Sequence, residues 1–213
     1  MCGEDDMWNS TANQMRIYVI RHGKTKGNTE HRYVGQATDE PLLSGEINEL
    51  KQELTIDSNA VLFISPMLRA KQTAEILFPG KEAVVVSDFI ETNFGDFEYH
   101  NYEELNGNPD YQSWVDRGGI DAFPNGESVK DMRTRVERGM KAVIAECRKR
   151  NASEAVIVAH GGTAMSIMAN ATGEDYFDFM VKNGEGFCLD LEVSLENEIH
   201  VVSYHRISCR ISA

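Results

Sequence analysis

The sequence has few cysteines, few basic residues and no long apolar run. Its four cysteines are scattered over 213 residues without a CxxC pair, so neither a disulfide framework nor a zinc site is indicated. No apolar run reaches the roughly 18 residues of a membrane-spanning helix, and the first fifteen positions lack the apolar core of a secretory signal. We therefore expect a soluble protein of the cytoplasm.

Acidic residues outnumber basic ones, with 34 Asp and Glu against 21 Lys and Arg and a formal net charge of -13. Nucleic acids and anionic membranes attract basic surfaces, so neither is expected as a partner. The few cations that cluster are informative for the same reason. Two arginines beside histidines would form a local positive pocket that suits a small anion.

The chain is long enough, and at 41% hydrophobic residues apolar enough, to bury one substantial core. Residues 1–14 show no helical or strand periodicity, and we interpret them as a loosely ordered extension before a single domain of residues 15–213. Residues 91–126 are rich in Asn, Gly, Tyr and acidic residues, which favours an irregular cap over a site. Both a monomer and a homodimer are compatible with these patterns.

Short apolar runs predict the strands of a sheet. Four lie at residues 15–20, 60–64, 84–86 and 155–159, and a closing pair at 187–193 and 199–204 is joined at Glu196 and Asn197. Strands that alternate with helices indicate an α/β fold. We expect a three-layer α/β/α sandwich with a mostly parallel central sheet and a small cap over the carboxyl ends of the strands.

Capping signals and apolar stripes predict the helices. Ser128 and Asp131 resemble a capping box, and the apolar stripe behind them predicts a helix over residues 129–147. Another helix is expected after Ser44. Its apolar stripe would consist of Ile47, Leu50 and Leu54.

Several residues that can carry chemistry follow the predicted strands. Ser65 and Pro66 predict a helix cap and a first-turn proline after the strand at 60–64, which places Arg69 in the first turns of that helix. His22 and His160 follow two other strands. Because ligands of such sheets bind beyond the carboxyl ends of the strands, we expect His22, Arg69 and His160 on one edge.

Histidine and arginine together suit the chemistry of phosphate esters. Hydrolysis of a phosphate monoester needs a nucleophile, a cationic cradle for the equatorial oxygens and an acid for the leaving oxygen. An imidazole with a pKa of about 6.5 is largely neutral at physiological pH and can attack phosphorus. Guanidinium groups stay charged and match phosphate oxygens in pairs. The pattern therefore offers candidates for each part of a phosphoryl transfer.

Three ordered motifs carry a resemblance to a known family. They are RHGKT at residues 21–25 with Asn28, SPMLRAKQTA at 65–74 and HGG at 160–162. Together they resemble the histidine phosphatase superfamily, also called phosphoglycerate mutase-like. The resemblance extends from about Met15 to about Tyr204, which is most of the chain.

The resemblance implies a role for each matching residue. His22 would be the nucleophile that accepts the phosphoryl group, and the phosphate pocket would be lined by Arg21, Arg69 and His160, assisted by Asn28 and the backbone of Gly161. Glu91 matches the family's acid, which protonates the leaving oxygen and then activates water. Without the resemblance, Glu91 could not be chosen over Asp88, Asp96 or Glu98. No metal and no organic cofactor is implied.

Three further segments resemble the short bacterial branch that includes α-ribazole phosphatase of cobalamin assembly. They are TDEPL at 38–42, FGDFE at 94–98 and GES at 126–128. The short interval between Glu91 and His160 favours hydrolysis over a cofactor-dependent phosphoglycerate mutase, which usually carries an insertion there. Lys24, Phe97 and Tyr99 depart from the family pattern, which leaves the substrate open.

We therefore expect a phosphatase that acts on a small phosphorylated metabolite through a phosphohistidine, with α-ribazole phosphate as one candidate. A phosphoglycerate mutase is the enzymatic alternative. A protein that has kept the pocket but lost turnover, and acts by binding phosphorylated partners, is the alternative of a different class.

Overall fold

The computed structural model describes residues 13–51, 53–194 and 198–211. The predicted extension lies outside these residues except for its last two positions, which belong to the first strand. The predicted junction at Glu196 and Asn197 also lies outside the described residues. The six strands are β1 (Asn13–Arg21), β2 (Val61–Ile64), β3 (Ala83–Val85), β4 (Glu154–Ala159), β5 (Glu185–Val193) and β6 (Ile199–Ser208). They form one sheet in the order β3-β2-β4-β1-β5-β6.

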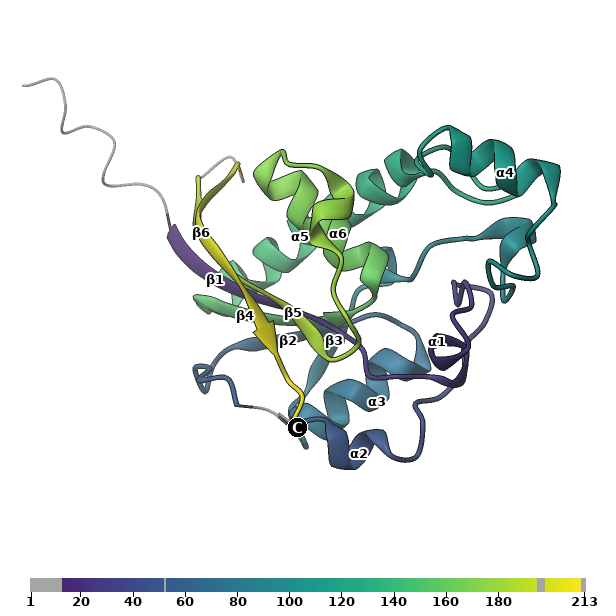
Figure 1. The fold of residues 1–213 in the computed structure, drawn as a ribbon. Coiled ribbons are helices and arrows are strands. Elements are labelled where there is room, and N and C mark those ends of the chain that lie inside the picture. The colour runs from purple at the N-terminus through teal and green to yellow at the C-terminus, as the bar shows by residue number, and fades with distance from the viewer. Residues whose placement is uncertain (1–12, 52, 195–197, 212–213) are drawn as a thin grey trace, which may run out of the picture.

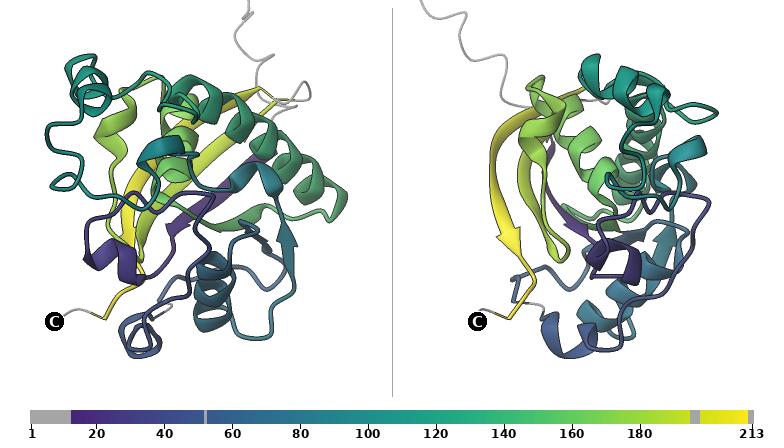
Figure 2. Two further views of the ribbon diagram at one scale, coloured as in Figure 1. Left: turned by 90° about the vertical axis from the view of Figure 1, so that its right-hand side faces the viewer. Right: turned by 45° about the vertical axis from the view of Figure 1, so that its right-hand side comes forward.

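Four neighbouring strands of the sheet are parallel, as predicted. β3 pairs with β2, β2 with β4, and β4 with β1, all in parallel, whereas β5 and β6 add an antiparallel hairpin on the β1 side. The carboxyl ends of β1, β2, β3 and β4 therefore meet at one edge. The left view of Figure 2 faces the side of the molecule on which β1 leads into α1.

Helices cover both faces of the sheet, which confirms the three-layer sandwich (Figure 1). They are α1 (Lys26–Thr29), α2 (Glu46–Glu49), α3 (Leu68–Leu77), α4 (Pro109–Asp116), α5 (Val129–Lys149) and α6 (Gly161–Thr172). Ile17 and Val19 of β1 pack with α5 and α6, and Tyr18 and Ile20 pack with α3 on the opposite face, because successive side chains of a strand alternate. Among the described residues, no helix combines the length and apolarity needed to cross a bilayer.

The longest helix begins where its capping box predicts. The Ser128 side chain accepts a hydrogen bond from the backbone of Asp131, and the Asp131 side chain accepts one from the backbone of Ser128. The stripe behind this box buries Met132, Val136 and Val143 against the sheet. This reciprocal cap and the apolar stripe together determine where α5 starts and which face it buries.

The helix predicted after Ser44 is much shorter than its apolar stripe suggested. α2 covers four residues, Ile47 is 65% exposed and Leu50 already has an extended backbone. Leu50 instead forms a β-bridge with Arg210, whose guanidinium pairs with the buried Glu46 carboxylate. A long-range ion pair and a bridge to the C-terminal segment therefore override a local periodicity.

The predicted cap of helix α3 was also wrong. Met67 is the N-cap residue, without a side-chain hydrogen bond, and Pro66 precedes it rather than lying in the first turn. The Ser65 hydroxyl accepts a hydrogen bond from Met67 N at 3.3 Å, before the helix begins, and also contacts the ring of His160. Arg69 does lie in the first turn of α3, as predicted.

Residues 91–126 have an apolar cluster of their own. It consists of Phe97, Leu105 and Phe123 with Tyr33, Phe94, Tyr111 and Trp114 packed against them. The segment includes α4 and the short 3-10 helix η2 (Gly95–Phe97), with η1 (Ser87–Phe89) just before it and η3 (Tyr176–Phe179) elsewhere in the chain. Its bounds as a separate cap remain a prediction.

Gly186 lets β5 approach the end of β1. A Cβ atom at this position would overlap the backbone carbonyl of Val19. We expect Gly186→Ala to lower the melting temperature by about 2–12 °C, since overpacking costs about 1–3 kcal/mol and each kcal/mol shifts a domain of this size by about 2–4 °C. Gly45→Ala, where a Cβ meets nothing within 4 Å, is the control and should change it little. Equal melting temperatures for the two variants would contradict this assignment.

Candidate active site

Four segments that are distant in sequence bring their side chains together at the carboxyl edge of the sheet. His22 follows β1, Arg69 lies in the helix after β2, Glu91 follows β3 and η1, and His160 follows β4 as the N-cap of α6. The rings of His22 and His160 are 5.1 Å apart between centroids and lie edge to face. The side chains converge because β1, β2, β3 and β4 are parallel neighbours in the sheet, so that their carboxyl ends lie at the same edge.

His22 is held in one tautomer. Its Nδ1 lies 2.6 Å from the carbonyl oxygen of Gly23, and because a carbonyl can only accept, Nδ1 carries the hydrogen and Nε2 has a free lone pair. Burial, followed by the charges of Arg69 and Arg21, lowers the pKa of His22 well below its usual value. The side chain is therefore a neutral imidazole with Nε2 available for attack.

The two arginines of the site, buried Arg69 and half-buried Arg21, keep donors without partners among the described residues. Arg69 donates to the carbonyl oxygens of Val34, Gly35 and Thr38 at 3.2, 3.1 and 2.8 Å. Arg21 donates through Nη1 to a backbone carbonyl at 2.7 Å. Among the described residues, the Nε atoms of both side chains are buried and have no hydrogen-bond partner. Two guanidinium groups with unused donors can bind an oxyanion.

His160 is a third side chain of the site with a buried nitrogen that has no partner among the described residues. Its Nε2 lies 2.6 Å from the Ser65 hydroxyl, and its Nδ1 is buried without a partner among the described residues. Burial, then the charges of Arg69, His22 and Arg21, lowers the pKa of His160 well below its usual value. It also stands at the N-terminus of α6, with Gly161 against the Arg21 side chain. The helix N-terminus and the cations together favour an anion such as phosphate.

Glu91 is a buried carboxylate beside this cationic group. Its Oε1 accepts hydrogen bonds from the backbone and hydroxyl of Thr92 at 2.8 and 3.1 Å, and its Oε2 accepts one from Gly162 N at 3.4 Å. Its charge opposes the burial effect on Arg21 and Arg69 by raising the pKa of each. The carboxylate therefore interacts electrostatically with both arginines of the site.

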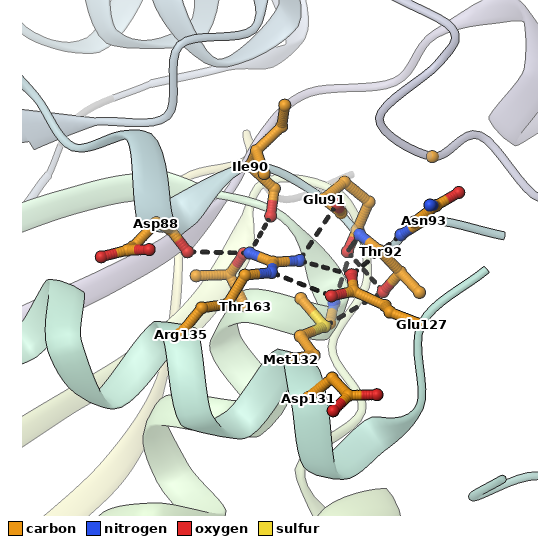
Figure 3. A network of polar contacts seen from close by, with 12 residues as sticks. Asp88, Ile90, Glu91, Thr92, Asn93, Glu127, Asp131, Met132, Arg135 and Thr163 are labelled. Atoms are coloured by element: carbon orange, nitrogen blue, oxygen red, sulfur yellow. Dashed lines mark hydrogen bonds and ion pairs between the residues drawn. The ribbon is translucent and has the colours of Figure 1, made fainter. Parts of the chain in front are cut away.

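An arginine outside the predicted set holds the segment that carries Glu91 (Figure 3). Arg135 of α5 donates to the backbone carbonyls of Asp88, Ile90 and Glu91 at 2.8, 2.7 and 3.1 Å. It also pairs with Glu127 at 2.6 Å, and Glu127 accepts from the backbone of Asn93 at 2.8 Å. The sequence marked the GES motif at 126–128 but did not show what its glutamate contacts.

The side-chain oxygen of Asn28 is hydrogen bonded within the protein. Its Oδ1 accepts from Thr25 N at 3.2 Å and from Asn183 Nδ2 at 2.9 Å. Asn183 Nδ2 also lies 3.1 Å from the carbonyl oxygen of His22. These bonds connect α1 and the segment before β5 to the loop that carries His22. Sequence reasoning missed Asn183, because a single asparagine in a loop carries no pattern.

A model of the histidine phosphatase superfamily (branch 1) matches residues 17–191 of the chain. The protein belongs to this superfamily. The four side chains His22, Arg21, Arg69 and His160 lie inside the matched region, and so does Glu91. Membership confirms the resemblance that the three motifs carried.

Relatives of this superfamily member have different names. An Escherichia coli protein named as a phosphoglycerate mutase, GpmB, is 29% identical over 157 residues, which are 69% of this chain and 70% of that protein. A Hydrogenobacter thermophilus protein named as a phosphoserine phosphatase is 26% identical over 164 residues, 74% of this chain and 79% of that one. The names of the sequence relatives therefore refer to different substrates.

Solved structures share the fold. The α-ribazole phosphatase from Shigella flexneri has a TM-score of 0.70 at 24% identity and covers 88% of this chain and 94% of its own. The phosphoglycerate mutase from Thermus thermophilus has a TM-score of 0.63 at 27% identity, with 93% and 99% covered. The fold is thus common to proteins named for hydrolysis and for transfer.

The protonation state of the two histidines can be measured directly. At about pH 6 an imidazole with a pKa of about 6.5 is roughly three-quarters protonated. We expect His22 and His160 to be less than half protonated there, because burial and the arginines lower both pKa values. Nitrogen chemical shifts, assigned with His22→Ala and His160→Asn, report this. Mainly protonated rings at that pH would contradict the expected effect of burial and neighbouring charge.

Proposed function

We propose that this histidine phosphatase superfamily protein hydrolyses the phosphomonoester of a small metabolite through a phosphohistidine at His22. One observation carries the proposal. A neutral imidazole with a free Nε2 lies beside the buried Nε donors of Arg21 and Arg69 and the buried Nδ1 of His160, none of which has a partner among the described residues. Such donors suit the equatorial oxygens of a phosphoryl group, where charge must be stabilised in the transition state.

The reaction has two balanced steps. In the first, His22 Nε2 attacks phosphorus, the bond from phosphorus to the ester oxygen breaks, and Glu91 gives a proton to that oxygen so that the alcohol leaves. In the second, Glu91 takes a proton from water, the water oxygen attacks phosphorus and the bond to His22 breaks. Inorganic phosphate leaves, and both side chains return to their first state.

The alcohol part of the substrate is less defined than the phosphoryl chemistry. α-Ribazole phosphate is one candidate, supported by the likeness in fold to the Shigella flexneri enzyme. A phosphoglycerate mutase is the second candidate, supported by the name of the Escherichia coli relative. The short interval between Glu91 and His160 favours hydrolysis. We place the reaction in the cytoplasm, on a small phosphorylated metabolite.

The direct test is phosphate release from a panel of α-ribazole phosphate, sugar phosphates, phosphoglycerates and p-nitrophenyl phosphate. We expect His22→Ala to lower kcat at least about a thousandfold on every active substrate, because it removes the nucleophile. His205→Ala, an exposed histidine of β6, is the matched control and should leave kcat unchanged.

Two results of this panel would reject hydrolysis. Isomerisation of a phosphoglycerate faster than phosphate release would identify a mutase. Binding of phosphate without turnover of any ester would identify a binding protein.

Arg135 should act on the reaction through Glu91. We expect Arg135→Gln to lower kcat/KM for an alkyl phosphate by about 10- to 100-fold, since general acid catalysis is typically worth about 10²–10⁴. The loss should be smaller for p-nitrophenyl phosphate, whose leaving group needs no protonation.

Arg138→Gln, which removes an exposed ion pair on the same helix, is the control for Arg135. The Glu91→Gln and Arg135→Gln effects should be non-additive in the double variant, because one residue positions the other. Equal losses of kcat/KM on the alkyl phosphate and on p-nitrophenyl phosphate would show that Arg135 stabilises the protein and does not act through Glu91.

A further inference from the structure

A cavity of about 200 Å³ adjoins the site at Glu91. Glu91 and Gly162, which are hydrogen bonded to each other, both belong to its wall. The rest of the wall comes from Tyr33, residues 92–123, Ser128, the first turn of α5, α6 and η3. The cavity is therefore continuous with the proposed proton donor and is formed by segments other than those that bear the two arginines.

Its wall is mainly aromatic and apolar. The six aromatic side chains are Tyr33, Phe94, Trp114, Phe123, Tyr176 and Phe177. Met132, Met165 and Val129 complete the apolar part. Glu91 is the only charged residue in the described wall, and no lysine or arginine is present in it to pair with an anion. We call this cavity the apolar pocket.

The position of Glu91 decides what the apolar pocket can hold. A general acid must lie within hydrogen-bond reach of the oxygen it protonates. The ester oxygen of a bound substrate would therefore be next to Glu91, and the carbon chain attached to it would extend beside that carboxylate. The apolar pocket borders Glu91, so it lies where that carbon chain would extend.

The size and polarity of the apolar pocket further limit the alcohol that can bind in it. An engineered apolar cavity of about 150 Å³ binds benzene, so about 200 Å³ suffices for one ring and a short linker. A carboxylate in this space would lose its hydration beside Glu91 with no cation to compensate. The alcohols of phosphoglycerate and phosphoserine carry such a carboxylate, and they fit the apolar pocket poorly.

We infer that the apolar pocket binds the alcohol part of the substrate, and that this part is uncharged and bears an apolar ring next to the ester oxygen. The inference rests on the proposed function and narrows it to a substrate class. It assigns the choice of substrate to aromatic side chains of residues 91–126 and η3, whereas the arginines bind the phosphoryl group of any ester.

The test compares two esters whose alcohols differ little in acidity, 2-phenylethyl phosphate and ethyl phosphate. We expect kcat/KM to favour the phenyl ester at least about tenfold, which corresponds to about 1.4 kcal/mol. Phe177→Asp places a charge in the wall and should reduce this preference to about twofold or less, mainly by lowering kcat/KM for the phenyl ester. Phe177 is 39% exposed, so the fold should tolerate the change.

Met180→Asp is the matched control. Met180 is 63% exposed, lies just after η3 and is not part of the wall, so this variant should keep the full preference. Circular dichroism would verify that both variants are folded. A preference retained in Phe177→Asp, or a preference below tenfold in the unmutated protein, would overturn the inference.

The test separates failure of the inference from failure of the proposed function. p-Nitrophenyl phosphate, whose leaving group needs no protonation, serves as the reference ester. If this ester and both alkyl esters release no phosphate, the proposed hydrolysis is wrong. If all three are hydrolysed without preference for the phenyl group, the protein is a phosphatase whose apolar pocket does not bind the alcohol.

Discussion

Arg69 carries a positive charge into the protein interior, and the site depends on how that charge is accommodated. Its side chain is 0% exposed, where an ion without partners would be costly. Three backbone carbonyls between Val34 and Thr38 accept its hydrogen bonds, and within the described residues it forms no direct ion pair. The charge therefore remains available to an anion, and it helps to keep His22 and His160 neutral.

The half-buried Arg135 works in the same way on another segment. Arg135 binds the carbonyls of residues 88, 90 and 91, as Arg69 binds those of 34, 35 and 38. Irregular segments lack the ladder of hydrogen bonds that a helix or strand has, and their carbonyls need other donors. A guanidinium supplies several donors from one rigid group. The sheet thus places the strand ends, and the arginines hold the connecting loops around them.

The polar and apolar parts of the site come from different parts of the chain. The arginines and histidines follow directly on strands or lie in the first turn of a helix after one, and the proposed alcohol pocket is built mainly from residues 91–126, α5, α6 and η3. A phosphoryl group needs the same cradle in every ester, whereas alcohols differ in size and charge. This division is consistent with relatives that share a superfamily and differ in named substrate.

The sequence alone determined the strands, helix α5 and the order of the three motifs, because runs of apolar residues and capping boxes are local patterns. It also predicted that His22, Arg69 and His160 would meet at one edge, which follows from strand ends in a parallel sheet. Only the tertiary structure decided that Ser65 contacts His160, that Leu50 leaves its helix to pair with Arg210, and that Arg135 and Asn183 support the site. These contacts join residues 44 to 161 positions apart in the chain, where no spacing or periodicity marks the partners. The apolar pocket is of the same kind, since its wall combines residues from Tyr33 to Phe177 that only packing brings together.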